Sequence, residues 1–395
     1  GMRLCAEMVR FLVAAETRYA YYQGGKSRPA TKSVTLGEHL RGNGYSNDFI
    51  ENILYPMFSI VCTCSYTAVD SYPADVAFEY YGRHGLFNWP WKKTCQCRVV
   101  GGIRKIAGLL ASRAKKMHLS TRVLYIRGGD GDGGAASAPQ KPIVAYVGAD
   151  GVERQSIFDH VVVASQANAA LRLLDNPTTA QRGALEAFEY ESSRVVVHTD
   201  RKLMPTDTDH WSPLNTFVNS IEVDSRDSGT DPKMPPPRGS IMGPMCTVWM
   251  NQIDPAVSPA VFQTWNPLIE PAQEHIVSES YFERPVVTTR SADAMRSLAE
   301  VQGSGGLWFV GAYALYSVPL LENGVRSGMR VANSLGCQVP WSGSVGVEED
   351  ANATWVGGQG KPGKGKGGKG NMVTVGLISM VAIAAIAGMK ANIRR

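Results

Sequence analysis

The stretch with the clearest chemical potential is GLWFVGAYALYSVPLLENGVRSGMRVANSLG, at residues 306–336. Its apolar start, GLWFV, reaches Gly311, where the backbone can approach a ligand closely because glycine has no Cβ. A helix then begins at Glu322–Asn323–Gly324, and the first turn of a helix presents free N–H groups with a partial positive charge. This helix start would stabilise a ring that becomes anionic on reduction. A strand–loop–helix unit of any α/β domain has the same pattern, so the assignment depends on its context.

Aromatic and histidine side chains offer candidates for a substrate pocket. Tyr316 lies in the same loop as Tyr313, and Trp211, Trp249 and His198 are further candidates. Each aromatic residue is equally well explained as part of an ordinary core. An acid–base role for His198 or for a second histidine, at position 84, would need a geometry that a sequence cannot supply, so no residue is assigned to catalysis.

Two Cys-x-Cys pairs, Cys62/Cys64 and Cys95/Cys97, contain four of the seven cysteines. Four thiolates could bind zinc, but the spacing differs from the usual Cys-x-x-Cys pattern. Free cysteine is often a small buried apolar residue, and we therefore predict no metal site.

The elements that must position these residues follow from local patterns. Residues 36–60 predict two helices, the second capped by Ser46, and IVAYVGADGVERQSIFDHVVVAS predicts a hairpin with a turn at Ala149–Asp150–Gly151, followed by a buried strand. Three further helices are predicted: an N-terminal one over CAEMVRFLVAAETRYAYY, a basic one over IRKIAGLLASRAKKM, and one over QANAALRLL that ends near Pro177. Two further strands are predicted over STRVLYI and MCTVWMNQI.

Composition places most of the chain in the globular class. Apolar residues make up 44% and charged residues 19% of the 395 residues, which is enough to build a core. The net charge of +5 comes from the tail, where 361–369 holds four lysines and Lys390, Arg394 and Arg395 follow. The rest is slightly acidic overall, so we predict no nucleic-acid partner.

The end of the sequence differs from the rest. Residues 339–371 are rich in glycine and lysine and predict a flexible linker. Residues 372–389 are 18 uncharged, mostly apolar residues, and as a helix they would span about 27 Å, enough for a thin bilayer. We therefore predict a single-pass C-terminal membrane anchor. Basic residues flank both of its ends, so the side of the membrane is left open.

Many separate stretches, in the same order along residues 30–336, resemble the flavin amine-oxidase-like superfamily. The likeness is strongest to NAD/FAD-binding oxidoreductases associated with cyclopropane-fatty-acid synthases. The stretches are TLGEHLRGNGYSNDFIENILYPM, FEYYGRHGLF, CRVVGGIRKIAGLLA, FDHVVVASQANAALRLL, LEAFEYESSRVVVHTDRKLMP, HWSPLN and the final GAY…ENGVRSGMRVANSL.

The resemblance implies an FAD cofactor and a role for individual residues. Val123 would bind the adenine through its backbone. The residues after two strands would pass near the cofactor, and the start of the last helix would lie beside the isoalloxazine ring; these are Ala164, Ser165, Gly311, Ala312, Tyr313, Glu322, Asn323, Gly324 and Val325. Two positions depart from the pattern, because Ala312 replaces a common aspartate and Leu321 replaces a histidine.

The resemblance also implies an N-terminal βαβ unit whose Gly-rich turn holds the pyrophosphate, and nothing before residue 35 matches it. Two explanations remain open. In the first, the sequence is a fragment of an FAD-dependent oxidoreductase that transfers hydride from an apolar substrate such as a lipid. Alternatively, it is a membrane-anchored pseudoenzyme or scaffold that has lost tight FAD binding.

The expected fold class is α/β with an α+β substrate part: a Rossmann-like amine-oxidase fold without its first βαβ unit, plus a transmembrane helix. The predicted parts are a helical part of the substrate domain (1–97), a cofactor part with the hairpin (98–175), the substrate domain (176–300), the flavin-contacting segment (301–338), the linker (339–371) and the membrane helix (372–389).

Overall fold

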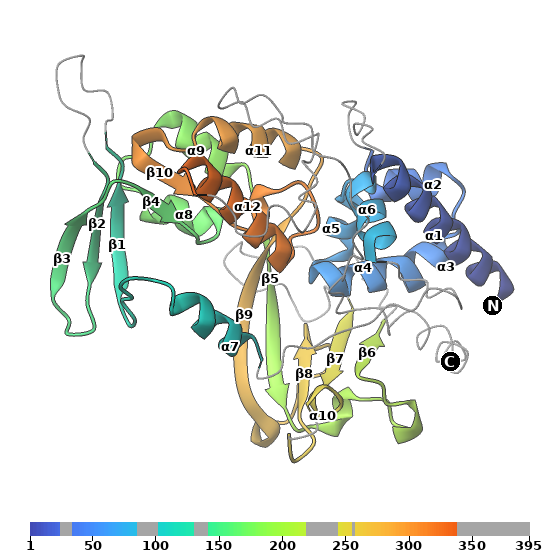
Figure 1. Ribbon diagram of the computed structural model, residues 1–395. Helices are drawn as coiled ribbons and strands as arrows, with labels where there is room; N and C mark the ends of the chain where they lie inside the picture. The colour runs from blue at the N-terminus through green and yellow to red at the C-terminus, as the bar shows by residue number, and fades with distance from the viewer. Residues whose placement is uncertain (24–33, 85–101, 130–140, 219–243, 255–256, 338–395) are drawn as a thin grey trace, which may run out of the picture.

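A computed structural model describes residues 1–23, 34–84, 102–129, 141–218, 244–254 and 257–337 (Figure 1). Within these ranges, no helix has both the length and the apolar character needed to cross a bilayer. The predicted membrane helix at 372–389 and the linker before it lie outside the described residues. The predicted division of the chain into six parts stays a prediction.

The first part of the chain is helical and forms its own core. It contains α1 (Met2–Gln23), α2 (Leu36–Gly42), α3 (Asn47–Phe49), the π-helical η1 (Ile50–Leu54), α4 (Tyr55–Cys62), α5 (Tyr66–Ser71) and α6 (Ala74–His84). Ser46 caps α3, and its hydroxyl accepts a hydrogen bond from the Phe49 amide at 3.3 Å, as the sequence predicts. Stacked and edge-on rings around Phe11 and Phe58 fill this core.

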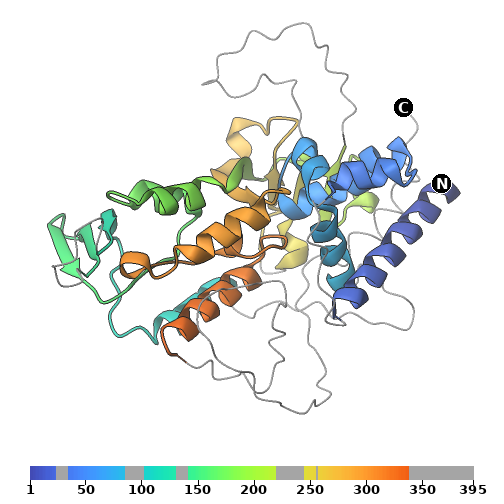
Figure 2. The same ribbon diagram turned by 90° about the horizontal axis from the view of Figure 1, so that it is seen from above.

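A second part combines a short parallel sheet with helices on both faces. Strand β4 (Val161–Val163) pairs in parallel with β10 (Leu307–Phe309). Figure 2 shows α12 (Leu321–Ser334) on one side and three helices, α8 (Ala167–Leu173), α9 (Thr179–Glu186) and α11 (Ser291–Glu300), on the other. The alternation of side chains along β10 explains the layers, because Leu307 and Phe309 pack on the three helices while Trp308 packs toward α12.

The outer edge of β10 is closed by a side chain. The Gln302 amide donates to the Phe309 carbonyl at 2.7 Å, and the Phe309 amide donates back to Gln302 Oε1 at 2.8 Å. The side chain thus makes the two hydrogen bonds that a neighbouring strand would make.

An antiparallel three-stranded sheet stands beside this part. It consists of β1 (Arg122–Arg127), β2 (Ile143–Val147) and β3 (Glu153–Ile157), and β2 and β3 form the predicted hairpin around Gly151, whose φ is 74°. The basic helix is shorter than predicted and forms α7 (Gly102–Ala111), which buries no side chain.

The third part is a five-stranded antiparallel sheet in the order β6-β7-β8-β5-β9. Its elements are β5 (Glu189–His198), β6 (Leu214–Phe217), β7 (Met245–Trp249), β8 (Phe262–Trp265), β9 (Ile276–Val286) and the short helix α10 (Met250–Ile253). The prediction of one strand over MCTVWMNQI is therefore correct only for its first half, because the chain turns into α10 at Met250. The two longest strands, β5 and β9, run from the second part to the far end of the molecule (Figure 1).

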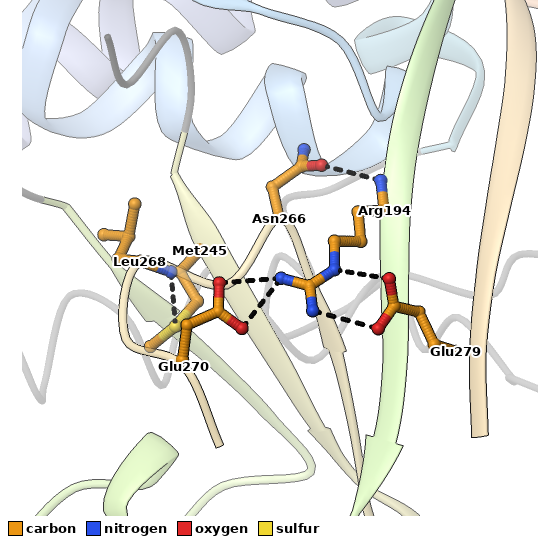
Figure 3. Close-up of polar contacts among 6 residues, drawn as sticks. All are labelled: Arg194, Met245, Asn266, Leu268, Glu270 and Glu279. Carbon is orange, nitrogen blue, oxygen red and sulfur yellow. Dashed lines mark hydrogen bonds and ion pairs between the residues drawn. The ribbon is translucent and has the colours of Figure 1, made fainter. Parts of the chain in front are cut away.

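An ion-pair network fastens the middle of β5 to its surroundings (Figure 3). The Arg194 guanidinium donates to both carboxylate oxygens of Glu279 on β9, at 2.9 and 3.0 Å, and contacts both oxygens of Glu270 at 2.8 and 2.9 Å. The Arg194 amide also donates to Asn266 Oδ1 at 3.1 Å. Such paired contacts are geometrically specific, so they fix the register of the two long strands.

Candidate functional site

The two parallel strands β4 and β10 end at the same edge of their sheet. Val163 lies opposite Phe309, and the Val310 amide donates to the Val163 carbonyl at 3.1 Å. The residues that follow, Ala164–Ser165 and Gly311–Ala312, are therefore neighbours. Ligands of α/β sheets bind outside the carboxyl ends of parallel strands, so the structure brings four of the predicted cofactor residues to a suitable edge.

The Ser165 hydroxyl is buried and has no hydrogen-bond partner in the described part of the chain. A buried hydroxyl without a partner costs roughly 1–3 kcal/mol, and a bound ligand can remove this cost. Ala164 beside it is exposed. This arrangement fits a polar ligand group next to the end of β4.

Gly311 is explained by packing within the chain. A Cβ at this position would meet the Tyr313 ring at 2.5 and 2.8 Å, so only glycine leaves room for the ring. The close approach predicted for a ligand is thus made by Tyr313 on this side of the backbone. The Gly311 amide donates to Ser327 Oγ on α12 at 3.0 Å, which ties the end of β10 to that helix.

The two tyrosines of the loop after β10 belong to different cores. Tyr313 packs its ring on Phe188 at 4.9 Å in the core under α8, α9 and α11, and burial raises the pKa of its hydroxyl. Tyr316 packs against the helical core instead, and its hydroxyl donates to Asp75 at 3.4 Å. The loop therefore joins two cores, and only Tyr316 lies toward the helices.

The start of α12 lacks a side-chain cap. Leu320 occupies the cap position and makes no side-chain capping hydrogen bond, although its carbonyl accepts a hydrogen bond from the Asn323 backbone amide at 3.0 Å. The amides of Leu321 and Glu322 therefore remain for a ligand. Asn323, predicted at the helix start, is the third residue of the helix. Its buried side-chain amide donates to the Val318 carbonyl at 2.9 Å and to Ser317 Oγ at 3.2 Å, which orders the preceding loop.

Open space lies beside the first turns of α12. A Cβ placed on Gly324 would meet no atom within 4 Å, and Val325 next to it is 57% exposed. A glycine inside a helix costs about 1 kcal/mol relative to alanine, and no packing within the described chain explains it here. A flat ligand lying close to the helix would explain it.

A pocket with an empty volume of about 280 Å³ lies between α6 and the start of α12. That figure includes space open to solvent, and the enclosed part of about 10 Å³ has room for about one water molecule, far below the range of about 300–1,000 Å³ typical of ligand sites. Its lining is partly apolar and partly charged: Val76, Glu79, Tyr80, Arg83, His84, Ser317, Val318, Leu320, Glu322 and Asn323.

Charged groups of two helices meet at this pocket. Arg83 Nη2 lies 2.7 Å from Glu322 Oε1 and joins the last turn of α6 to the first turn of α12. Burial and the nearby Arg83 lower the pKa of His84, while Glu322 opposes this shift, so the imidazole is neutral at pH 7. The sequence analysis did not identify Arg83, because no local pattern reveals a contact between residues 239 positions apart.

The other substrate-pocket candidates meet in a second place. The Trp211 ring lies 5.1 Å from that of Trp249 and 5.5 Å from that of Phe262, which lies 5.7 Å from the imidazole of His198. His198 Nε2 is 2.7 Å from Thr264 Oγ1, and that oxygen is 2.9 Å from Thr247 Oγ1. We call this group the far cluster.

The far cluster is remote from the pocket beside α12. Tyr190, near the start of β5, contacts the cofactor part, where its hydroxyl oxygen accepts a hydrogen bond from the Ala167 amide at 2.8 Å. His198 ends the same strand eight residues later, which corresponds to roughly 26 Å of extended chain. The structure therefore does not bring Trp211, Trp249 and His198 together with Tyr316 in one pocket.

Val123 lies on β1, which pairs with β2 on one side, so β1 is an edge strand of its sheet. Its side chain packs against the core under α8 and α9. The backbone contact to adenine predicted for it stays a prediction.

The described cysteines do not form a metal site. Cys62 and Cys64 are buried, and a hydrogen bond to Cys62 together with burial raises the pKa of Cys64, so Cys64 is a thiol rather than a thiolate. In the described ranges, no group of three or more His, Cys, Asp or Glu side chains is arranged to bind a metal. Cys95 and Cys97 lie outside these ranges.

Comparison with solved structures supports the fold. Putrescine oxidase bound to putrescine matches with a TM-score of 0.50 and 12% identity, over 85% of this chain and 76% of that one. The CLA-producing fatty acid isomerase from P. acnes matches with a TM-score of 0.46 and 15% identity, over 76% of this chain. The chain covers 66% of the length of that isomerase. A search of curated proteins found no match.

The family comparison covers most of the chain. The family described as "Flavin containing amine oxidoreductase" matches residues 4–335. This range includes both parallel strands, the loop after β10 and α12 up to its last turns. The buried Ser165 hydroxyl, the uncapped start of α12 and the open space at Gly324 fit a flavin cofactor. The chain belongs to the flavin-containing amine oxidoreductase family.

Proposed function

We propose that this chain carries the flavin-facing and substrate-facing parts of an FAD-dependent oxidoreductase that oxidises an apolar, lipid-like substrate by hydride transfer. The observation that carries the proposal is the uncapped first turn of α12 with open space at Gly324, next to a pocket. FAD, when bound, supplies the hydride acceptor.

The chain's own residues have separate roles in this proposal. The first amides of α12 hold the ring edge that gains negative charge, as helix starts do for anions. Ser165 and the residues after β4 and β10 hold the polar part of the cofactor. Val76, Tyr80 and Val318 give the pocket its apolar wall, which excludes water and suits a hydrocarbon group. No residue is assigned to proton transfer.

The finer assignments are proposals too. We place the chain among the oxidoreductases associated with cyclopropane-fatty-acid synthases because of the stretches quoted above. We further propose that residues 372–389 anchor the protein in a membrane, where a lipid substrate would be concentrated. Extraction of membranes with alkaline carbonate tests the anchor, since an integral protein stays in the membrane fraction.

Binding of the ADP half of FAD needs a βαβ unit with a Gly-rich turn, and the described ranges do not contain one. A second candidate, which the sequence leaves open, is a membrane-anchored protein that keeps the fold as an interaction surface without tight FAD binding. The two candidates predict different colours for the purified protein.

An absorbance spectrum of the full chain distinguishes them. The oxidoreductase is expected to carry oxidised flavin, visible as absorbance in the blue that bleaches when dithionite is added. Added FAD should quench its fluorescence on binding if the cofactor is lost during purification. A colourless protein that also fails to bind added FAD contradicts the first proposal and supports the scaffold.

A further inference from the structure

Arg284 on β9 lies where three parts of the chain meet. Its Nη1 donates to the Val61 carbonyl at 3.1 Å and to Thr63 Oγ1 at 3.2 Å, at the end of α4. Its Nη2 donates to the Pro319 carbonyl at 3.4 Å. Pro319 directly precedes Leu320, which occupies the cap position of α12. One half-buried guanidinium therefore joins the end of α4 to the entrance of α12.

This guanidinium is not held by a carboxylate. Among the described residues, Arg284 makes no ion pair, and its three acceptors are neutral oxygens. Glu191 lies opposite it on β5, but the two Glu191 carboxylate oxygens accept hydrogen bonds from the amide and the hydroxyl of Ser65, each at 2.7 Å. The planar fork of arginine reaches acceptors that lie in different directions. The shape of the side chain, rather than an ion pair, therefore explains its contacts.

Two of the three hydrogen bonds are explained by the end of α4. Val61 belongs to the last turn of that helix, where carbonyls lack partners within the helix and a cation is favourable. Thr63 follows with a left-handed φ of 46°, and its carbonyl accepts a hydrogen bond from the Ser193 hydroxyl at 2.9 Å. These contacts stabilise the fold. The hydrogen bond to Pro319 adds nothing to α4 and needs a different explanation.

Pro319 lies in the short stretch that leads into α12. The side-chain amide of Asn323 holds the residues before it, and the backbone amide of Asn323 donates to the Leu320 carbonyl after it at 3.0 Å. The Pro319 carbonyl between these contacts is bound from β9 by Arg284. The stretch therefore has one anchor on the helix and one on the sheet, and together they fix the direction in which α12 starts.

We propose that Arg284 is a positioning residue for the flavin, because it holds the Pro319 carbonyl and thereby aims the amides of Leu321 and Glu322 at the ring. The inference rests on the proposed function and adds to it a residue that acts through the loop without touching the ring. Fixed dipoles stabilise a developing negative charge better than mobile ones, since they do not have to reorient. Loss of Arg284 should therefore weaken the binding of reduced flavin more than that of oxidised flavin.

The test compares two substitutions in the full chain loaded with FAD. Arg284→Met removes the charge and every donor, whereas Arg284→Lys keeps the charge but has a single nitrogen, which cannot occupy both Nη positions. Both should lower the affinity for reduced flavin about threefold relative to oxidised flavin, which lowers the two-electron potential by ~14 mV. The potential is measured by following flavin absorbance during reduction beside a reference dye.

Two controls separate the position of the loop from stability and from charge. Thr63→Val removes the hydroxyl contact at the end of α4 and leaves the contact to Pro319, so it should lower the thermal unfolding temperature without changing the potential. Arg290→Met removes a guanidinium from an ion pair with Glu189 at 2.7 Å, in which the Arg290 side chain is 82% exposed. It should leave the potential unchanged and alter stability little.

The remaining outcomes contradict specific claims. The parent potential in Arg284→Lys overturns the inference, because the charge alone would then be sufficient. An equal shift in Thr63→Val overturns it as well, since the end of α4 would then control the ring. A full chain that binds no flavin overturns the proposed function and the inference with it. If Arg284→Met does not fold, Arg284→Lys decides the test alone.

Discussion

The two ends of the long strand β5 offer a direct comparison. Near Tyr190, the strand meets α8 and the parallel sheet, where Ser165 has no hydrogen-bond partner, α12 starts without a cap and a pocket opens. At His198 it enters the far cluster, where the imidazole is fully buried and bonded to Thr264.

Unpaired polar atoms alone do not distinguish these ends. Among the described residues, Trp249 Nε1 in the far cluster also lacks a partner, and His198 Nδ1 lies near the Asp200 backbone without completing a hydrogen bond. The difference is that the described pocket lies beside α12, and no residue of the far cluster lines it. The comparison teaches that a ligand site needs both unpaired donors and a volume beside them.

Substitution in the far cluster should have the largest effect on folding. His198→Ala removes a fully buried ring and leaves the Thr264 hydroxyl without this partner, so we expect a loss of about 3 kcal/mol in the free energy of unfolding. Flavin affinity should not change. Denaturant unfolding and FAD titration measure the two effects, and His210→Ala, on an exposed ring, is the control with little expected loss. A weaker FAD affinity in His198→Ala would show that the far cluster affects the cofactor site, and it would contradict the separation of the two ends of β5.

Acid should lower the free energy of unfolding through the buried histidines. Burial lowers the pKa of His198 and of His84, and burial with the nearby Arg18 lowers that of His39 to about 4. The unfolded chain takes up protons at about pH 6.5, while the folded protein does so only at lower pH. Stability is therefore complete above pH 6.5 and falls as the pH drops toward 4, by up to about 1.4 kcal/mol per pH unit for each histidine.

Unfolding free energies measured between pH 7.5 and 4.5 test this dependence. Replacing His198 by Gln should make the slope shallower, because one of the groups that take up a proton is removed. An unchanged slope would mean that His198 takes up its proton at the same pH in the folded and unfolded states.

Gly324→Ala should separate folding from binding. The substitution removes the cost of a helical glycine and should stabilise the protein by up to about 1 kcal/mol, since its Cβ meets no atom. If the flavin ring lies against this turn, FAD affinity should fall at least tenfold. Gly183→Ala on α9 is the matched control, because its Cβ also meets no atom and it is far from the pocket lining. Equal FAD affinity in both variants would mean that the flavin ring does not lie against Gly324.

Ser165→Ala should have the smallest effect on stability. Its hydroxyl has no partner to lose among the residues that the structure describes, so the free energy of unfolding without FAD should be unchanged or slightly higher. With FAD, the loss of one hydrogen bond should weaken binding by about 0.5–1.5 kcal/mol. Thr264→Val in the far cluster should behave in the opposite way, destabilising the protein without affecting FAD. A destabilised Ser165→Ala protein would indicate that the hydroxyl supports the fold.

Local patterns in the sequence were sufficient for many elements. Ser46 caps its helix as predicted, and the turn at Gly151 closes its hairpin. The apolar stretch at 307–309 is a buried strand, but in its parallel partner at 161–163, which the sequence predicts to be buried, only Val163 is buried and Val162 is exposed. These features depend on hydrogen bonds and backbone preferences within a few residues, which the sequence displays directly. The parallel pairing itself could be expected only through the family resemblance.

The candidate site was predictable only in part. The sequence pointed to the edge after β4 and β10 and to the start of α12, and the structure brings the residues of that edge together. It could not show that Gly311 makes room for Tyr313, or that Tyr316 turns toward the helical core while Trp211 lies at the far end of the sheet. Each of these outcomes depends on which side chains meet across long distances in the chain.

The sequence by itself determined the family, the order of the elements and the flavin-related segments, because each leaves a local or collinear signature. Only the tertiary structure decided the contact of Arg83 with Glu322, the closing of β10 by Gln302 and the separation of the pocket from the far cluster. The physical reason is that packing selects among many compatible long-range contacts, and the selection is a property of the whole core rather than of any segment.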